Sequence, residues 1–292
     1  MHDFDYIAPD KLPDALDLVS RYGASARALA GGTDLIGAMR SGKALPKLVI
    51  DVKKISELNA LRISDEELTL GAAVSCRKIW SDKRVADFFP ALLDSAKLIG
   101  GLTIQGRASL GGNLCNAAPS GDSIPTMIVL KAKATTLGPK GKREIEVEKF
   151  CIDPGKNILA DDELLVNVRI PIAKKGHGAA FLRFTPRNEM DIAIVNAASS
   201  VVLSASGDKF LESRIAIGAV APTPLFVPEA GDSLVGKKVC SRSIEEAAKI
   251  AADHAKPISD MRGTLVQRKH LTSVMVTRTL LKAIDRAGGQ VD

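Results

Sequence analysis

Apolar residues in the first fifty positions alternate between helical spacing and short continuous runs. They recur three and four positions apart after Asp10, which predicts a helix that Asp10 caps, with Pro13 in its first turn and Gly23 at its end. Further runs predict strands at 4–8, 27–30 and 47–52 and a second helix at 34–39. This order predicts a small β-α-β-α-β unit that is parallel in part.

Beyond Ile55 the pattern changes to hairpins and short helices. Two hairpins are predicted where strand-like runs flank an acidic or glycine-containing turn, at 60–63 with 68–72 and at 135–137 with 143–147. Helices are predicted where a cap or an early proline precedes helical spacing: a short one capped by Ser75, one at 90–99 and one at 124–132. The apolar run at 164–170, which Pro171 ends, predicts one further strand.

A charged segment with two glycines at 174–178 has no apolar periodicity and predicts a linker. Strands are predicted after it at 181–184, 192–203 and 214–220, although the alanine-rich middle run could also form a helix. Two helices end the chain, one at 244–254 capped by Ser243 and one that runs to about Ala287.

We therefore expect an α+β chain of two domains. The first is predicted at 1–173, with subdomains at about 1–54 and 55–173, and the second at 179–292. The length of 292 residues agrees with this division, since domains average roughly 150 residues.

Two glycine pairs interrupt the pattern, in AGGTD at 30–34 and in SLGGN at 109–113. Glycine tolerates positive φ and lets another group approach the backbone closely, and successive exposed N–H groups bind anions. One such pair is most often an ordinary turn. Two pairs among alternating strands and helices favour a diphosphate held from two sides. Neither pair belongs to a Walker A or a G-x-G-x-x-G motif.

Polar side chains beside these pairs strengthen the diphosphate hypothesis. Thr33 has a hydroxyl where a predicted strand leads into a helix. Further donors near the second pair are Ser109, Asn113, Asn116 and Ser120. Asp122 has two interpretations: it accepts a hydrogen bond from a sugar hydroxyl, or it caps the helix at 124–132.

Composition and charge narrow the function classes. Lysine and arginine exceed aspartate and glutamate by 40 − 34 = 6, but they are scattered along the chain and only 4% of residues are aromatic. We therefore expect no nucleic-acid partner, because such surfaces gather basic and aromatic side chains. A basic nucleotide-binding protein fits the same charge.

The remaining chemistry-bearing residues indicate neither a catalytic nor a metal site. The four cysteines have no CxxC spacing, so we expect reduced thiols and neither zinc nor an iron–sulfur cluster. The four histidines lie near a terminus, in the linker or in polar helices, and no nucleophile-base or two-carboxylate arrangement is visible. The acidic start is not a signal peptide, and no apolar run is long enough to span a membrane. We expect a cytoplasmic protein.

Together, AGGTDL at 30–35, ASLGGNL at 108–114 and PSGD at 119–122 resemble the FAD-binding medium subunit of the molybdenum hydroxylase family, of the carbon monoxide dehydrogenase / xanthine dehydrogenase type. The resemblance extends along the chain through F-x-Y at 4–6, DDELL at 161–165 and RIAIG at 214–218. It implies a two-subdomain FAD-binding fold of the vanillyl-alcohol oxidase (PCMH) type, followed by a C-terminal α+β domain of the CO dehydrogenase flavoprotein type. Two segments depart from the family pattern: the residues before the second glycine pair, where relatives carry Ile-Arg-Asn, and Gln267, where relatives carry Tyr.

The resemblance also implies a set of FAD-binding residues. The first loop would wrap the pyrophosphate, the second would hold it from the other side, Asp122 would bind the sugar part, and Arg183 would lie near the isoalloxazine. Ile99 and Leu165 would lie near the flavin or the adenine. The full set is Arg27, Ala28, Leu29, Ala30, Gly31, Gly32, Thr33, Asp34, Ile99, Ala108, Ser109, Gly111, Gly112, Asn113, Asp122, Leu165 and Arg183.

The cofactor is expected to be bound without a covalent bond. Oxidases of the wider fold can attach FAD through a histidine after the double glycine, and Thr33 occupies that place here. Cys115 lies beside the second glycine pair, where we expect a packed thiol rather than a flavin linkage.

The function implied is that of an electron-transfer subunit of an oxidoreductase complex. A large partner would hold the molybdenum cofactor and oxidise the substrate, a small partner would hold [2Fe–2S] clusters, and FAD in this chain would pass electrons to an external acceptor. The family suggests a heterohexamer, a dimer of heterotrimers. Two alternatives stay open: a stand-alone flavin oxidase or dehydrogenase, and a non-catalytic assembly subunit.

Overall fold

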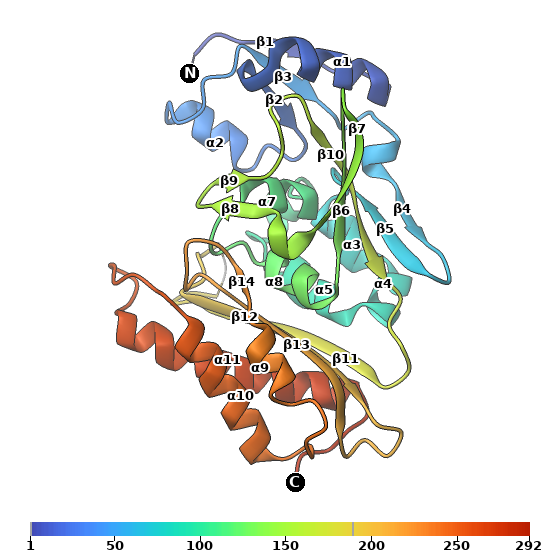
Figure 1. Ribbon diagram of the computed structural model, residues 1–292. Coiled ribbons are helices and arrows are strands. Elements are labelled where there is room, and N and C mark those ends of the chain that lie inside the picture. Colours follow the sequence, from blue (N-terminus) through green and yellow to red (C-terminus); the bar gives the residue numbers. More distant parts are fainter. Residues whose placement is uncertain (1, 189) are drawn as a thin grey trace.

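A computed structural model describes residues 2–188 and 190–292 and shows three tiers (Figure 1). A small parallel sheet lies at the N-terminal end, a five-stranded antiparallel sheet with short helices lies in the middle, and a four-stranded antiparallel sheet with long helices forms the C-terminal end. The arrangement is α+β, as the family resemblance implied.

The N-terminal tier is the predicted parallel unit. Its strands are β1 (Asp5–Ile7), β2 (Ala26–Leu29) and β3 (Leu48–Asp51), with β3 central and both neighbours parallel to it. Its helices are α1 (Leu12–Tyr22) and α2 (Leu35–Arg40). The predicted cap is wrong: Lys11 is the N-cap residue of α1, and no side chain caps the helix there. Packing of its buried face holds α1, since Leu12, Ala15, Leu18 and Val19 are buried.

The middle sheet has the order β4-β5-β10-β6-β7. Its strands are β4 (Leu61–Ile63), β5 (Glu67–Gly71), β6 (Lys133–Gly138), β7 (Gly141–Glu146) and β10 (Leu164–Pro171). Both predicted hairpins, β4–β5 and β6–β7, are confirmed. A separate small hairpin is formed by β8 (Cys151–Asp153) and β9 (Lys156–Asn157).

Short helices cover this sheet. They are α3 (Cys76–Ser81), α4 (Lys83–Phe88), α5 (Pro90–Ala96), α6 (Leu102–Gln105), α7 (Leu110–Asn116) and α8 (Ser123–Val129). The Ser75 cap is confirmed, because its hydroxyl accepts a hydrogen bond from Lys78 N. Two predicted helices are shorter than expected, α5 by three residues and α8 by three at their C-terminal ends. The helices α4, α6 and α7 were not predicted from the sequence pattern.

The C-terminal sheet runs β11 (His177–Phe184), β12 (Val195–Leu203), β13 (Phe210–Gly218) and β14 (Leu225–Phe226) in chain order. The segment 195–203 is a strand, so the helical alternative is wrong. β11 begins at His177, so the predicted linker at 174–178 is partly strand. Helices α9 (Pro228–Asp232), α10 (Ser241–His254) and α11 (Leu265–Arg286) follow. Cys240, not Ser243, is the N-cap residue of α10, and Ser243 completes a capping box from the third helical position.

Both faces of β12 are buried, which explains why apolar and polar residues do not alternate along it. One face carries Ala198 into the core shared with the first 173 residues, and the other carries Val195 and Ala197 into a second core beneath α10 and α11. Strands buried on both faces lose the usual alternation of apolar and polar residues. The C-terminal sheet therefore lies between α8 on one side and its own helices on the other (Figure 1).

Candidate functional site

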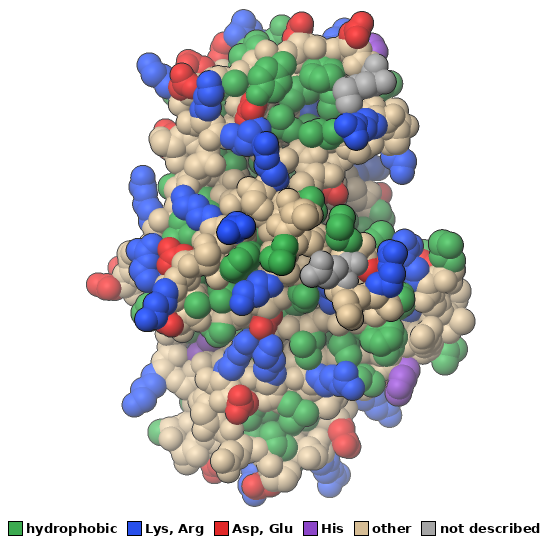
Figure 2. Space-filling view, turned by 180° about the vertical axis from the view of Figure 1, so that it is seen from behind, with side chains coloured by type: hydrophobic (Ala, Val, Ile, Leu, Met, Phe, Trp, Pro, Cys, Tyr) green, Lys and Arg blue, Asp and Glu red, His purple; other side chains and the backbone are tan. Residues whose placement is uncertain are grey.

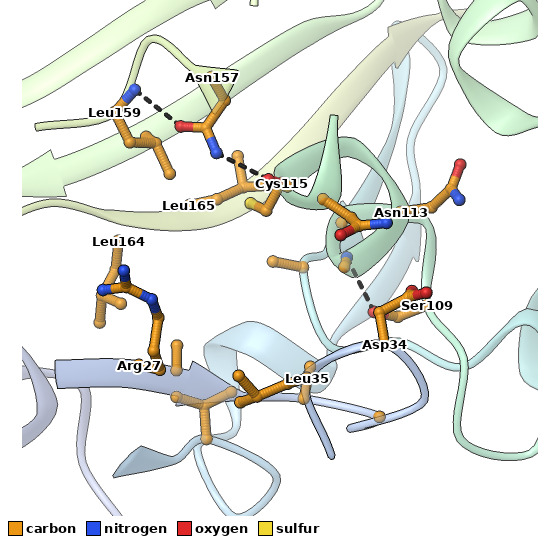
Figure 3. A pocket seen from close by; sticks show the side chains of 18 of the residues that line it. Arg27, Asp34, Leu35, Ser109, Asn113, Cys115, Asn157, Leu159, Leu164 and Leu165 are labelled. Carbon is orange, nitrogen blue, oxygen red and sulfur yellow. Dashed lines mark hydrogen bonds between the residues drawn. The ribbon is translucent and has the colours of Figure 1, made fainter. Parts of the chain in front are cut away.

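A cavity of about 700 Å³ lies between the N-terminal tier and the middle sheet. Figure 3 shows Arg27 and Leu35 on one wall, Ser109, Asn113 and Cys115 on a second, and Leu159, Leu164 and Leu165 on a third. The two glycine pairs, some eighty residues apart in the chain, both line this cavity. The cavity is therefore the place to test the predicted site residues.

The first glycine pair forms the turn between β2 and α2. Gly32 has φ +75°, which glycine adopts without strain, and its carbonyl accepts the Ile36 N–H at 3.0 Å. In the described part of the chain, the backbone N–H groups of 32–34 donate no hydrogen bond. They remain available to a ligand in the cavity.

The second glycine pair is not a turn, which corrects our expectation. Gly111 and Gly112 lie in the first turn of α7, where the Ser109 hydroxyl caps the helix by accepting the Gly112 N–H at 3.0 Å. Glycine has a low helix propensity, so its presence needs another reason. A β-carbon on Gly111 would stand 2.4 Å from the Ala72 carbonyl oxygen, whereas one on Gly112 would meet only the Ser109 hydroxyl at 2.9 Å. Gly111 thus permits chain packing, and Gly112 leaves the cavity wall bare.

The third wall comes from the β8–β9 hairpin and the segment after it. The Asn157 side chain donates to the Cys115 carbonyl at 2.7 Å and accepts the Leu159 N–H at 3.0 Å, so it fixes the hairpin to the end of α7 (Figure 3). This wall was missed at the sequence level. Its lining residues are Ile152, Gly155, Lys156, Asn157, Leu159, Ala160, Asp161, Glu163 and Leu164. The DDELL run at 161–165 was the one signal that pointed to it.

Most of the predicted residues line the main cavity. They are Arg27, Ala28, Ala30, Gly31, Gly32, Thr33, Asp34, Ile99, Ala108, Ser109, Gly111, Gly112, Asn113 and Leu165. Leu29, Asp122 and Arg183 are not among the lining residues. The Asn113 oxygen is already engaged, because it accepts the Ser123 hydroxyl at 2.7 Å.

Asp122 and Arg183 form a buried ion pair. Their side chains are 9% and 5% exposed. Asp122 is the N-cap residue of α8, but its side chain caps no backbone N–H, so the capping interpretation is wrong. Burial raises the pKa of Asp122 to about 6, against the charge and hydrogen bond of Arg183 and a hydrogen bond from Asn196, all of which lower it.

Arg183 also lines a second, smaller cavity of about 370 Å³. Trp80 and Lys97 lie there too, with the Lys97 ammonium 5.9 Å from the centre of the Trp80 ring. The buried Gln105 amide supports this wall, since it accepts the Trp80 indole N–H at 3.0 Å and donates to the Lys97 carbonyl at 2.7 Å.

The other features named from the sequence are a cysteine, metal ligands, membrane-spanning helices and basic residues. Cys115 lines the main cavity, and burial raises the pKa of its thiol to about 12. Across residues 2–188 and 190–292, no cluster of three or more His, Cys, Asp or Glu side chains could hold a metal ion. Nor does any helix in these ranges have the length and apolarity needed to cross a membrane. Lys and Arg side chains are spread over the back of the molecule among acidic and apolar ones (Figure 2).

Comparison with known proteins places this geometry in context. The family model described as the FAD binding domain in molybdopterin dehydrogenase matches residues 2–173, and the CO dehydrogenase flavoprotein C-terminal domain matches 180–283. The chain is 32% identical over 284 residues to the carbon monoxide dehydrogenase medium chain of Afipia carboxidovorans, covering 97% of this chain and 98% of that one. It is 29% identical to the xanthine dehydrogenase FAD-binding subunit of Escherichia coli O157:H7, covering 100% of both. A solved chain of reconstituted CO dehydrogenase from Oligotropha carboxidovorans superposes with a TM-score of 0.93 at 30% identity, covering 97% of this chain and 98% of that one.

Proposed function

The chain belongs to the molybdenum hydroxylase family as an FAD-binding flavoprotein subunit, and we propose that it carries electrons between a partner's [2Fe–2S] clusters and an external acceptor. The observation that carries this proposal is the convergence of two distant glycine pairs on one cavity of about 700 Å³. When bound, FAD would be the electron carrier, because its flavin ring exchanges electrons singly or in pairs.

The cavity suits a dinucleotide with a pyrophosphate at its middle. Two bare backbone surfaces face it, the turn at 31–34 and the first turn of α7 at Gly112. The N–H groups of 32–34 donate no hydrogen bond within the described part of the chain, so they are suitable donors for phosphate oxygens. The Gly112 N–H is held by Ser109, and Gly112 offers close approach instead. We propose that 30–34 and 109–113 hold the pyrophosphate from opposite sides. Thr33 stands where oxidases of the wider fold can carry a histidine bonded covalently to the flavin, and threonine cannot form that bond. We therefore propose that FAD is bound non-covalently.

Apolar residues of the cavity suit the ring systems of a dinucleotide. Ile99 and Leu165 line the cavity and offer apolar contact to a planar ring. Asp122 lies outside this lining, and we propose it as the acceptor for a sugar hydroxyl of the cofactor. Arg183, which pairs with Asp122, lines the second cavity together with Leu98 and Gly100, the chain neighbours of Ile99. We propose that this is the isoalloxazine end and that the Arg183 charge stabilises reduced, anionic flavin.

The rest of the electron path is assigned to other chains. We propose a large subunit with the molybdenum cofactor, where substrate is oxidised, and a small subunit with the [2Fe–2S] clusters, assembled as a dimer of heterotrimers in the cytoplasm. Support comes from relatives that are named as medium chains or FAD-binding subunits of dehydrogenases. Four free cysteines agree with a reducing compartment.

Native purification of the tagged chain from its source cells tests the proposal. We expect two further subunits to co-purify, identified by mass spectrometry, and about one FAD per chain to be released on denaturation. The isolated chain should bind FAD without oxidising any substrate that the complex oxidises. A flavin-free complex would favour an assembly role, and turnover by the isolated chain would favour a stand-alone oxidase.

A further inference from the structure

We propose that Asn196, a buried residue of the C-terminal sheet, is a positioning residue for FAD. It holds Asp122 and the turn before it, so that the C-terminal sheet completes a site whose other walls come from the first 173 residues. The inference rests on the proposed function, because Asp122 matters to the cofactor only if FAD binds here.

Two neighbouring strands each supply a side chain that contacts Asp122. Arg183 on β11 and Asn196 on β12 are register partners, so their side chains lie next to each other on the same face of the sheet. Arg183 forms the ion pair with one Asp122 oxygen, and the Asn196 amide nitrogen lies 3.4 Å from the other. Arg183 therefore neutralises the carboxylate and Asn196 orients it without adding charge.

Gly218 on β13 makes room for this arrangement. It is the register partner of Asn196 on the other side, and a β-carbon there would stand 2.2 Å from the Asn196 amide oxygen. With Gly218 in place, the Asn196 side chain can turn toward the first 173 residues. The Asn196 amide nitrogen also lies 3.4 Å from the Ser120 carbonyl oxygen.

The turn that carries Asp122 is held at a second point by the same sheet. The Ala219 N–H donates to the Pro119 carbonyl at 2.7 Å, from a residue with φ +63°. Arg268 on α11 supports both strand ends, because its guanidinium donates to the carbonyls of Ile194 at 2.8 Å and Ala219 at 3.0 Å. The position of Asp122 is thus set largely by the C-terminal part.

Stability alone does not account for an asparagine at this place. Asn196 is fully buried, and its amide oxygen has no hydrogen-bond partner among the residues described. An unpartnered buried acceptor is costly, and an apolar side chain of the same shape would avoid that cost. A role for the amide N–H toward Asp122 gives the residue a reason to be polar.

The test compares FAD binding to apoprotein of the full chain, measured by flavin fluorescence, in Asn196→Leu and Ser200→Ala. Leucine keeps the shape of asparagine and removes its donor. Ser200 is the matched control, since it lies on the same strand and also donates across to the first part, to Val129 O at 3.0 Å, away from Asp122. We expect Asn196→Leu to weaken FAD binding about tenfold and Ser200→Ala to change it less than twofold.

Two further readouts separate positioning from general structure. In a double-mutant cycle with Asp122→Asn, the loss from Asn196→Leu should nearly vanish, because both changes act on one carboxylate. The midpoint of FAD affinity against pH should rise in Asn196→Leu and stay unchanged in Ser200→Ala. If Asn196→Leu does not fold, Asn196→Ala, which also lacks a side-chain donor, carries the same expectations.

Wild-type affinity in the Asn196 variant, or a loss that adds fully to that of Asp122→Asn with an unmoved pH midpoint, would overturn the assignment. If wild-type apoprotein does not bind FAD at all, the proposed function fails instead, so the two failures are distinguishable.

Discussion

Gly31 lies so close to the Arg107 carbonyl that a β-carbon at position 31 would stand 2.2 Å from its oxygen. The turn after β2 thus packs directly against the backbone that leads into α7, and Gly111 packs in the same way against Ala72 O. The first glycine of each pair therefore joins parts of the protein. The second glycine of each pair has another role. Gly32 adopts a positive φ, and Gly112 leaves the cavity wall without a side chain.

Alanine substitutions should separate these roles. We expect Gly31→Ala and Gly111→Ala to lower the free energy of unfolding by about 1–3 kcal/mol, because each overpacks a backbone contact. Gly112→Ala should leave stability nearly unchanged and weaken FAD binding about tenfold. Gly37→Ala, in α2 with open space around its added carbon, is the control: FAD affinity should stay unchanged and stability should not fall, because alanine favours a helix by about 1 kcal/mol over glycine. Full FAD affinity in Gly112→Ala would contradict the proposed approach of the pyrophosphate to α7.

Asp122 should make FAD affinity depend on pH. Its pKa is raised to about 6 by burial, and a sugar hydroxyl donates best to the ionised carboxylate. We therefore expect affinity to rise as pH increases through about 6 and to level off above it. The apoprotein should show the opposite trend, losing stability as pH rises from about 4 to 6, since its folded state holds the proton more tightly than the unfolded chain. Titrations of FAD from pH 5 to 8 check this, and Asp122→Asn should give a flat profile.

Removal of Arg183 should leave Asp122 as an unpaired buried charge. We expect Arg183→Ala to cost about 3 kcal/mol of unfolding free energy at pH 8, where Asp122 is ionised. The pKa of Asp122 should rise further without its cationic partner, so the loss should shrink as pH falls and Asp122 takes up a proton. Denaturant unfolding at pH 5 and pH 8 measures the difference. The double variant Arg183→Ala/Asp122→Asn should lose this pH dependence, and an equal loss at both pH values in Arg183→Ala would contradict the buried pair.

The reduction potential of bound FAD should depend on Arg183. With FAD bound, we expect Arg183→Ala to lower the reduction potential more than it lowers occupancy, because the cation favours the anionic reduced form. Spectroelectrochemical titration against wild type measures this shift. An unchanged potential would remove Arg183 from the isoalloxazine end.

The glycine pairs and the family resemblance together predicted part of the cavity lining. Sequence pattern predicted the parallel unit and both hairpins, because these rest on local periodicity and on turn residues. It did not reach α7, since Gly111 and Gly112 oppose a helix locally and the Ser109 cap and packing against Ala72 stabilise it. Nor did it predict that Arg183 and Asn196 contact Asp122. They lie 61 and 74 residues after Asp122 in the chain, and only the sheet brings them together. The β8–β9 wall has strands of three and two residues, too short for any period to appear.

A carboxylate on α5 fastens the C-terminal part to the first. Asp94 accepts hydrogen bonds from Arg286 at 2.6 and 3.0 Å, from Lys282 at 2.9 Å and from the Phe181 N–H at 3.2 Å. We expect Asp94→Ala to lower the unfolding free energy by about 1–3 kcal/mol and to speed amide exchange along α11 and β11, because hydrogen bonds to a charged group are lost. Hydrogen exchange with mass spectrometry measures this. Asp87→Ala, at an exposed site on α4, is the control. Equal amide exchange in both variants would show that the Asp94 contacts do not stabilise α11 and β11.

The four cysteines should react with a thiol reagent at different rates. Burial raises the pKa of Cys76 and Cys115 to about 12 and that of Cys151 to about 11, whereas the Ser243 hydroxyl and N–H groups at the start of α10 lower that of Cys240. Because the thiolate is the reactive form, iodoacetamide at pH 7.5 should label Cys240 first. Peptide mapping of timed samples checks the order, with Cys240→Ser as the variant that should lose the fast phase.

Addition of FAD should change only one of these rates. Cys115 lines the main cavity and Cys240 lies at the start of α10, in the C-terminal part. A cofactor that fills the cavity covers the Cys115 sulfur, so its slow labelling in the apoprotein should become slower still while the rate at Cys240 stays constant. Equal protection of both thiols would indicate a general tightening of the chain, and no protection of Cys115 would place the cofactor outside the cavity between β2 and α7.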